Sequence, residues 1–239
     1  MSDLLDLAIQ AHGGLARWNE FQRLTVDVSV GGAVWALKGQ PNLFDDIRYE
    51  AQTHVQQATT YRVGAPDRLV RFTPQRVSLE TESGELIQTR DDPRSAFQGH
   101  TNETPWDVLH AAYFDSYALW TYLNQPFLYT WPDFLTEELE PWDENGETWR
   151  RLKVTFPDWV TSHTREQVTY FGPDGLMRRH DYAVDVLGGT FGAQYIYDYV
   201  EANGIMVPTR RRIFPLADGN QSLPEPLLVS IDITAPRFA

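Results

Sequence analysis

The chain has 239 residues, of which 42% are hydrophobic and 13% aromatic, and its formal net charge is −13. This length and apolar content predict a single domain, residues 1–239, with a substantial core. The acidic charge disfavours nucleic-acid binding and electrostatic docking on anionic lipid. The absence of cysteine excludes disulfides, thiolate catalysis and cysteine-ligated metal.

The N-terminal segment "MSDLLDLAIQAHGG" predicts a helix that Ser2 caps and that the pair Gly13-Gly14 interrupts. Asp3 and Asp6 lie within its apolar part, so it is a poor signal peptide. No apolar run reaches the about 18 residues that a membrane-spanning helix needs. We therefore expect a cytoplasmic protein without an integral membrane segment.

Residues 24–30 alternate between apolar and polar side chains, a pattern typical of a strand with one wet face. The stretch "AVWALKG" after Gly31-Gly32 is interpreted as the next strand. Further short strands are predicted at roughly 44–51, 54–63, 67–72, 75–81 and 85–89, with turn residues between them. Residues 91–103 are interpreted as a loop.

Residues 104–124, "TPWDVLHAAYFDSYALWTYLN", predict a helix with Thr104 as N-cap and Pro105 at its first position. One arc of roughly 140° is mostly aromatic; it contains Trp106, Leu109, His110, Tyr113, Phe114, Tyr117 and Trp120. The other side is rich in alanine, with Asp115 as its main charge. A helix that is apolar nearly all round is buried on both sides. We expect the aromatic arc to face a sheet, and the alanine-rich side to pack on the N-terminal helix or a loop.

The second half predicts a tight hairpin at Asn145-Gly146. Strands are predicted at 148–156, 165–171, 176–187, 192–202, 205–214 and 227–233. Tyr195, Tyr197 and Tyr199 share one face of their strand, which we expect to line the same concavity. Residues 210–212 are three arginines. They are interpreted as part of a charged strand whose positive charges balance the acidic surface.

Together these elements predict an α+β fold that is mainly β. Roughly ten to twelve strands would form a large curved antiparallel sheet, a half-barrel that wraps the N-terminal helix and the central aromatic-rich helix. Its concave face must be covered by apolar side chains, which the helices supply.

The N-terminal pattern A-x-x-A-H-G-G-x-x-x-W consists of Ala8, Ala11, His12, Gly13, Gly14 and Trp18. With the two meanders and the central helix, it resembles the LolA-like half-barrel superfamily, which includes lipoprotein carriers. The resemblance covers most of the chain. It implies a curved sheet around helices that encloses a cavity for acyl chains or similar apolar ligands.

The leading hypothesis is therefore a small hydrophobic molecule bound between the concave sheet and the helix 104–124. The residues that we expect to contact it are Trp106, Phe114, Trp120, His100, His163, Arg178, Tyr195 and Tyr197. His163 begins a strand at a sheet rim, where pocket mouths form. Arg178 shares a strand face with His180 and Tyr182 and could hold an acidic ligand group.

The alternative is a cofactor-independent enzyme that uses the same cavity for proton transfer on an apolar or aromatic substrate. Asp107 would orient His110 as general base, and Tyr113 or Tyr117 would donate hydrogen bonds to a developing oxyanion. The competing interpretation is that Asp107 only caps the helix and that the rings are plain core. A third hypothesis is an interaction module whose exposed aromatic side chains bind another protein.

We expect no cofactor and no metal. The sequence has no GxSxG elbow, P-loop or Rossmann fingerprint. His100, His110 and His163 could converge on a metal ion, but their spacing matches no metal motif.

Overall fold

The computed structural model describes residues 3–239. The predicted cap Ser2 lies outside the described residues. The first half comprises α1 Asp3–Ala11, α2 Leu15–Trp18, β1 Arg23–Gly31, α3 Ala33–Leu37, β2 Ile47–Gln52, β3 Ala58–Tyr61, β4 Arg68–Thr73, β5 Arg76–Thr81, β6 Leu86–Asp91 and the 3-10 turn η1 Ser95–Phe97.

The second half comprises α4 Val108–Asn124, η2 Phe127–Thr130, β7 Leu135–Glu144, β8 Glu147–Thr155, β9 Glu166–Phe171, β10 Met177–Val184, η3 Asp185–Leu187, β11 Thr190–Ala202, β12 Ile205–Ala217, η4 Asp218–Asn220, β13 Gln221–Ser222 and β14 Val229–Phe238. The Asn145-Gly146 hairpin is confirmed between β7 and β8, with both residues at positive φ.

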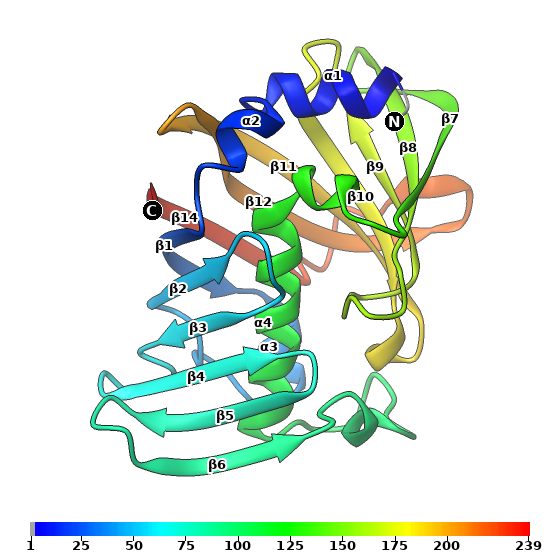
Figure 1. Ribbon diagram of the computed structural model, residues 1–239. Helices are drawn as coiled ribbons and strands as arrows, with labels where there is room; N and C mark the ends of the chain where they lie inside the picture. Colours follow the sequence, from blue (N-terminus) through cyan, green and yellow to red (C-terminus); the bar gives the residue numbers. More distant parts are fainter. Residues whose placement is uncertain (1–2) are drawn as a thin grey trace.

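The described residues form one sheet of 14 strands in the order β6-β5-β4-β3-β2-β1-β14-β12-β11-β10-β9-β8-β7, with β13 paired to β12. The chain meanders outward from β1 to the edge strand β6. It then crosses through α4 to the opposite edge, β7, and meanders back until β14 pairs with β1 in antiparallel register. The first strand of the chain, β1, and its last, β14, therefore lie side by side in the middle of the sheet (Figure 1).

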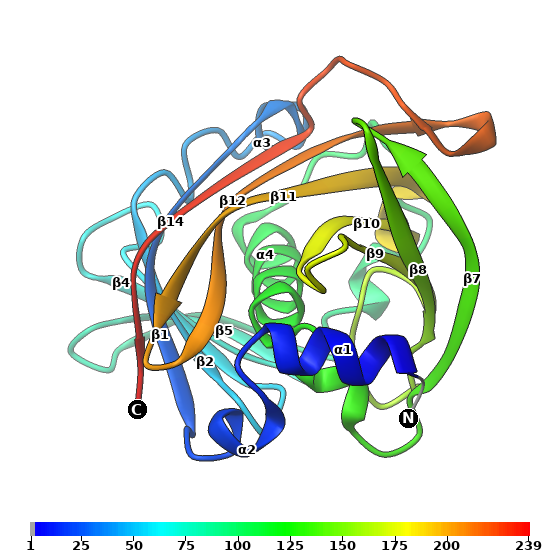
Figure 2. The same ribbon diagram turned by 90° about the horizontal axis from the view of Figure 1, so that it is seen from above.

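The sheet curls around α4, which stands upright inside it (Figures 1 and 2). The view from above shows strands on several sides of the helix, while α1 lies across the end of the half-barrel. This confirms the predicted mainly β half-barrel around the central helix. Twist explains the curl, because an antiparallel sheet of this width does not stay flat.

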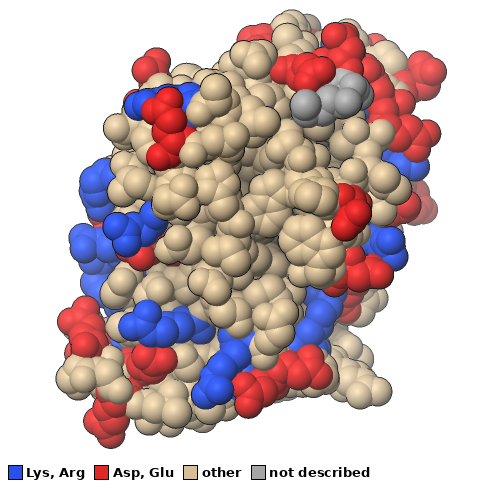
Figure 3. Space-filling model, viewed as in Figure 1, with Lys and Arg blue, Asp and Glu red and all other residues tan. Residues whose placement is uncertain are grey.

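The alternation at residues 24–30 is confirmed in β1. Leu24, Val26, Val28 and Val30 are buried, and the residues between them are at least partly accessible. The five short strands predicted between residues 44 and 89 are confirmed as β2 to β6. On the outside, Figure 3 shows charged side chains mainly along the margins of one face, with uncharged side chains across its middle.

The predicted strand "AVWALKG" is wrong, because residues 33–37 form the helix α3. The backbone N–H groups of Ala33 and Val34 donate to the carbonyls of Leu227 and Leu228, which redirects the chain away from the sheet. Gly32 makes the turn at φ 109°, where a Cβ would lie 2.5 Å from the carbonyl oxygen of Leu228. Short apolar runs do not distinguish a helix from a strand by periodicity.

The central helix begins three residues later than expected. Its N-cap is Asp107, whose carboxylate accepts from the backbone N–H of His110 at 2.9 Å. The expected cap, Thr104, instead accepts from the N–H of Thr101 in the preceding turn. The physical reason is that both residues are good caps, and contacts outside the helix, such as the Trp106 N–H bond to the Lys38 carbonyl, decide between them.

The strand β7 was not predicted, since its sequence is acidic and contains Pro141. Both features suit its place at a sheet edge, where charges and proline prevent further pairing. Its register against β8 shifts between Leu139 and Trp142, around the proline.

Candidate ligand pocket

The helix α4 is buried nearly all round, as its composition predicts. Apart from Val108 and His110, all of its residues are buried. The side that carries Tyr113 and Trp120 packs closely on β2 to β4. The Tyr113 ring lies 5.8 Å from that of Phe72, and the Trp120 Nε1–H donates to the Gln52 carbonyl.

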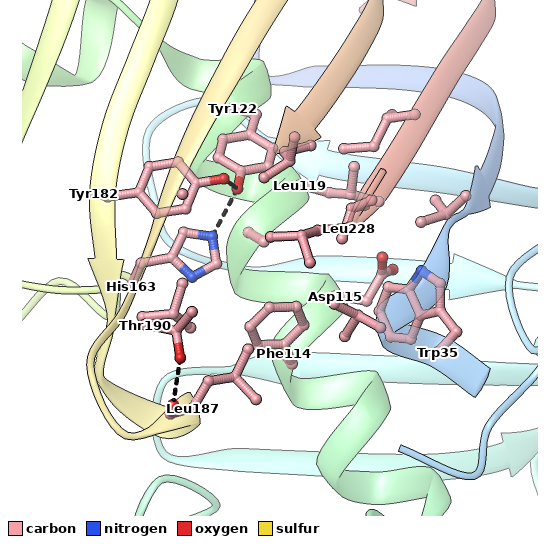
Figure 4. A pocket seen from close by; sticks show the side chains of 18 of the residues that line it. Trp35, Phe114, Asp115, Leu119, Tyr122, His163, Tyr182, Leu187, Thr190 and Leu228 are labelled. Atoms are coloured by element: carbon pink, nitrogen blue, oxygen red, sulfur yellow. Dashed lines mark hydrogen bonds between the residues drawn. The ribbon is translucent and has the colours of Figure 1, made fainter. Parts of the chain in front are cut away.

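A pocket lies on another side of α4, beside Phe114, Ala118 and Leu119 (Figure 4). Its apolar wall is completed by strands of the sheet and by α3; the residues are Val30, Val34, Val184, Ile213, Val229 and Ile231. The cavity volume is about 50 Å³, and all the space that atoms leave free there, including the open mouth, is about 560 Å³. The expectation that the alanine-rich side packs on the N-terminal helix or a loop is therefore wrong at Ala118.

The pocket mouth lies near the turn between β10 and β11. Phe191, which is 56% exposed, and the partly accessible Thr190 line it there. Gly188 and Gly189 form this turn with positive φ and would meet nothing if a Cβ were added.

Three polar side chains on one side of the pocket bind each other. The Tyr122 hydroxyl lies 2.7 Å from Nε2 of His163 and 2.6 Å from the Tyr182 hydroxyl. The other ring nitrogen, Nδ1, lies 3.1 Å from the Tyr117 hydroxyl. Burial, with a smaller effect of the Arg94 charge, lowers the pKa of His163 to about 3, so the imidazole is neutral near pH 7. Both ring nitrogens of His163 and the hydroxyls of Tyr122 and Tyr182 therefore have hydrogen-bond partners within the protein.

A buried arginine, Arg211, is hydrogen-bonded to the backbone of this group. Arg211 donates to the Tyr122 carbonyl at 2.8 Å and to Oε1 of Gln194 at 2.6 Å. It does not line the pocket. The interpretation of residues 210–212 as one charged surface strand is thus wrong for its middle residue, whereas Arg210 and Arg212 form surface ion pairs, with Asp198 and Asp232.

On another side of the pocket, Asp115 and Trp35 are buried, with exposed fractions of 3% and 4%. Among the described residues, Oδ2 of Asp115 and Nε1 of Trp35 have no hydrogen-bond partner. Burial raises the pKa of Asp115 from 3.8 to about 8, so the carboxyl group is mainly protonated near neutral pH. Neither residue was expected in a site from the sequence. The available signal was an aspartate in the middle of the apolar run "YFDSYALW".

Of the predicted ligand contacts, Phe114 and His163 line the pocket. Trp106 lies behind Phe114, with 5.0 Å between ring centroids, and Trp120 is on the side of the helix that packs on the sheet. Tyr117 does not line the pocket, but it contacts two residues that do, His163 and Phe114. The structure therefore brings together part of the predicted set.

Asp107 and His110 are in contact, with 2.8 Å between Oδ1 and Nδ1, but they lie at the start of α4 and do not line the pocket. Burial alone would raise the pKa of Asp107, but bonds from Arg90 and the His110 N–H lower it to about 2. Nε2 of His110 lies 3.2 Å from the Ala96 carbonyl oxygen. The ring of His100 packs beside it, at 4.9 Å between centroids.

His163 lies in the pocket wall, apart from this histidine pair. Within residues 3–239, histidine and carboxylate side chains form no group of three or more that could hold a metal ion. None of the helices in that range has the length and apolarity that crossing a membrane requires.

The expectation that Tyr195 and Tyr197 face the concavity is wrong. Tyr195 belongs to a separate cluster, with Trp149, Tyr170 and Ala193, and stacks on Tyr197, which is 37% exposed. Asp198 is in the left-handed region (φ 56°) and interrupts the strand alternation, so that Tyr199 packs on the main core. Alternation groups these tyrosines on one face of β11 but does not say which face is inside.

Arg178 is also outside the pocket, because it forms ion pairs with Asp174 and Glu147 near the turn between β9 and β10. The chain is irregular there, with a register shift between Met177 and Arg179. His180 and Tyr182, which were expected to share its face, are buried next to Tyr122 instead.

Solved structures with the same architecture exist, although no family model matches the chain and no curated protein matches its sequence. A DUF1329 family protein from Desulfovibrio piger is 13% identical, with a TM-score of 0.57 over 98% of this chain and 91% of that chain. A putative outer membrane lipoprotein-sorting protein domain from Vibrio parahaemolyticus is 10% identical, with a TM-score of 0.53 over 98% and 91%.

A LolA superfamily protein from Nitrosomonas europaea aligns with 11% identity and a TM-score of 0.47, over 95% of this chain and 92% of that chain. At these identities a likeness concerns the fold. The alignments with the Desulfovibrio and Vibrio structures span nearly the whole chain, and they show that it has the fold of those two proteins.

Proposed function

We propose that the protein binds a small hydrophobic ligand in the pocket between α4 and the strands β1, β12 and β14. The observation that carries this proposal is the apolar cavity beside Ala118 and Leu119, inside the half-barrel. Ligand pockets are typically apolar with a few polar groups that orient the ligand. The lipoprotein-sorting description of the Vibrio structure, which has the same fold, supports a lipid-like ligand.

The dimensions favour a narrow ligand. A cavity volume of about 50 Å³ accommodates a short apolar segment, such as part of a single alkyl chain. The rest of a longer chain would extend through the mouth beside Phe191. Entry past the glycine turn at residues 188–189 requires local movement of side chains rather than opening of the sheet.

The proton-transfer alternative has less support from the geometry. Asp107, His110 and Tyr113 do not line the pocket, and Tyr117 contacts His163. His163 is a poor general base near neutral pH, because burial holds its pKa at about 3. The interaction-module hypothesis has less support from α4, whose aromatic side chains are buried.

Filling the cavity tests the proposal. Native mass spectrometry of freshly purified protein should detect a bound apolar ligand, and calorimetric titration with decanol should detect binding. Ala118→Leu places three extra carbons in the cavity, so we expect affinity to fall at least about tenfold with little loss of stability.

Ala112→Leu is the matched control, because Ala112 is buried on the same helix but does not line the pocket. It should cost about 1–3 kcal/mol of stability through overpacking, and the folded variant should keep its affinity for decanol. Equal decanol affinity in the wild-type protein and Ala118→Leu would contradict the proposed site.

A further inference from the structure

Some polar side chains that line the pocket have hydrogen-bond partners, and others do not. His163, Tyr122 and Tyr182 are bonded to one another or to their neighbours, as described above. Asp115 and Trp35 each keep a buried polar atom without a partner among the described residues. Such groups are rare in folded proteins, and each one calls for a specific explanation.

Asp115 and Trp35 come from different elements and meet at the same cavity. Asp115 lies in the middle of α4 and Trp35 in α3, and both line the pocket. Figure 4 shows the carboxyl group of Asp115 and the nitrogen-bearing edge of Trp35 on the same side of the pocket. The Trp35 ring is held by Phe44 and Phe114, with centroid distances of 4.9 and 6.0 Å.

We infer that Asp115 and Trp35 form a polar anchor that hydrogen-bonds an uncharged oxygen of the hydrophobic ligand, such as a hydroxyl, ester or ketone group. This inference rests on the proposed function and specifies the ligand class of the same pocket. The apolar part of the ligand would lie along Ala118 and Leu119, with its oxygen directed towards α3.

The donors of this pair define the ligand group. The indole N–H of Trp35 can only donate, so the ligand atom must accept, which an ammonium group cannot do. A protonated Asp115 donates one hydrogen bond and keeps a carbonyl oxygen that accepts. A hydroxyl group on the ligand can accept from the indole N–H and donate to the carbonyl oxygen of Asp115. An ester or ketone oxygen can accept from both the indole N–H and the O–H of Asp115.

A carboxylate ligand is disfavoured by charge. Asp115 is the only Asp, Glu, Lys or Arg among the residues that line the pocket. Lys38 and Arg211 do not line the pocket; Lys38 donates to the carbonyls of Thr101, Asn102 and Thr104, and Arg211 donates to Gln194 and the Tyr122 carbonyl. A carboxylate ligand would therefore be desolvated without a cation in the pocket lining.

The test compares ligands of one shape with different ends. Calorimetric titrations use decanol, undecane, decylamine and decanoate on the chain of 239 residues. We expect decanol to bind about tenfold more tightly than undecane, the value of one or two buried hydrogen bonds. Decylamine and decanoate should bind more weakly than decanol.

Two variants remove the anchor in different ways. Asp115→Leu replaces the carboxyl group by an apolar side chain of similar size, and Trp35→Phe removes the N–H but keeps a ring. Each should reduce the preference for decanol over undecane to about threefold or less. Trp106→Phe is the control, because Nε1 of Trp106 is also buried without a partner within residues 3–239, but Trp106 does not line the pocket. This variant should prefer decanol over undecane as strongly as the wild-type protein does.

The outcomes separate this inference from the proposed function. Equal binding of decanol and undecane, with Ala118→Leu still blocking both, overturns the anchor and leaves the hydrophobic site intact. Strongest binding of decylamine that Asp115→Leu abolishes overturns the uncharged-oxygen assignment, because Asp115 would then act as a carboxylate. Absence of binding by every probe overturns the proposed function itself.

Discussion

Asp115 shows how a single residue links stability to the pocket. Its burial in α4 raises the pKa to about 8. In the unfolded chain the same carboxyl group ionises near 3.8. Between these two values the folded state binds more protons than the unfolded state, so the contribution of Asp115 to stability falls as pH rises from about 4 to about 8.

Asp115→Asn should remove this dependence. The amide has nearly the same shape and does not ionise. We expect the variant to gain stability relative to the wild-type protein by up to about 1.4 kcal/mol for each pH unit between pH 4 and 8. Urea unfolding at a series of pH values measures the difference. If the free energies of unfolding of Asp115→Asn and the wild-type protein differ by the same amount at every pH in this range, Asp115 is ionised in the folded protein.

At this scale, the sequence allowed a partial prediction of the pocket. Phe114 was identified because the helix composition is local information. His163 was identified because it was expected to begin a strand at a sheet rim, although it lies three residues before β9. Trp35 was missed, since "AVWALKG" was interpreted as a strand. Its place beside Asp115 depends on backbone bonds between α3 and residues 227–228, which are far away in the sequence.

At the scale of elements, the pair Gly13-Gly14 positions α1 against the sheet. Gly13 has φ +115°, and a Cβ there would lie 2.2 Å from the carbonyl oxygen of Gly204 in the turn between β11 and β12. The N–H of Met206 donates to the His12 carbonyl at 3.1 Å. The glycine therefore permits two backbones to approach closely, which is a physical reason for this part of the A-x-x-A-H-G-G pattern.

Gly13→Ala should be strongly destabilising. Both the positive φ and the backbone contact oppose a side chain, so we expect a loss of at least about 3 kcal/mol in the free energy of unfolding. Gly84→Ala is the matched control, because Gly84 has φ +90° and nothing within 4 Å of the added Cβ. It should lose only about 1–2 kcal/mol. Equal losses in chemical denaturation would mean that the contact with Gly204 contributes nothing.

Elements with a clear periodicity of apolar side chains were predicted correctly. Elements whose structure depends on contacts with neighbouring elements were not. The strand β1 and the all-round burial of α4 follow from side-chain spacing. The strand β7 does not, because its acidic, proline-containing sequence forms a strand only where β8 offers a partner at the sheet edge. The start of α4 likewise depends on contacts outside the helix.

At the scale of the whole molecule, buried neutral histidines set the acid limit of stability. Burial lowers the pKa of His12 to about 4 and that of His163 to about 3, and it lowers the pKa of His180 well below its usual 6.5. Below pH 6.5 the unfolded chain takes up protons at these sites while the folded protein does not. Stability is therefore lost as pH falls from about 6.5 towards the folded values.

Asp115 acts with the opposite sign, because its contribution to stability falls as pH rises from about 4 to about 8. His163→Gln should reduce the loss on the acid side by up to about 1.4 kcal/mol per pH unit, although the variant is less stable near neutral pH, where it lacks the bonds to Tyr117 and Tyr122. The exposed His54 provides the control, and His54→Gln should follow the wild-type profile. Urea unfolding between about pH 4 and 7 measures how the free energy of unfolding changes with pH. The same pH dependence for His163→Gln and the wild-type protein would contradict the burial of a neutral imidazole.

The sequence by itself determined the mainly β architecture, the tight hairpins and a central helix buried on every side, because spacing and turn chemistry are local properties. Only the tertiary structure decided which side of α4 meets the cavity, which face of β11 turns inward and which polar groups stay unpaired there. These features depend on segments that are distant in the chain, as when Leu24 in β1 pairs with Phe238 in β14. Packing between such segments leaves the space in which we propose that a ligand binds.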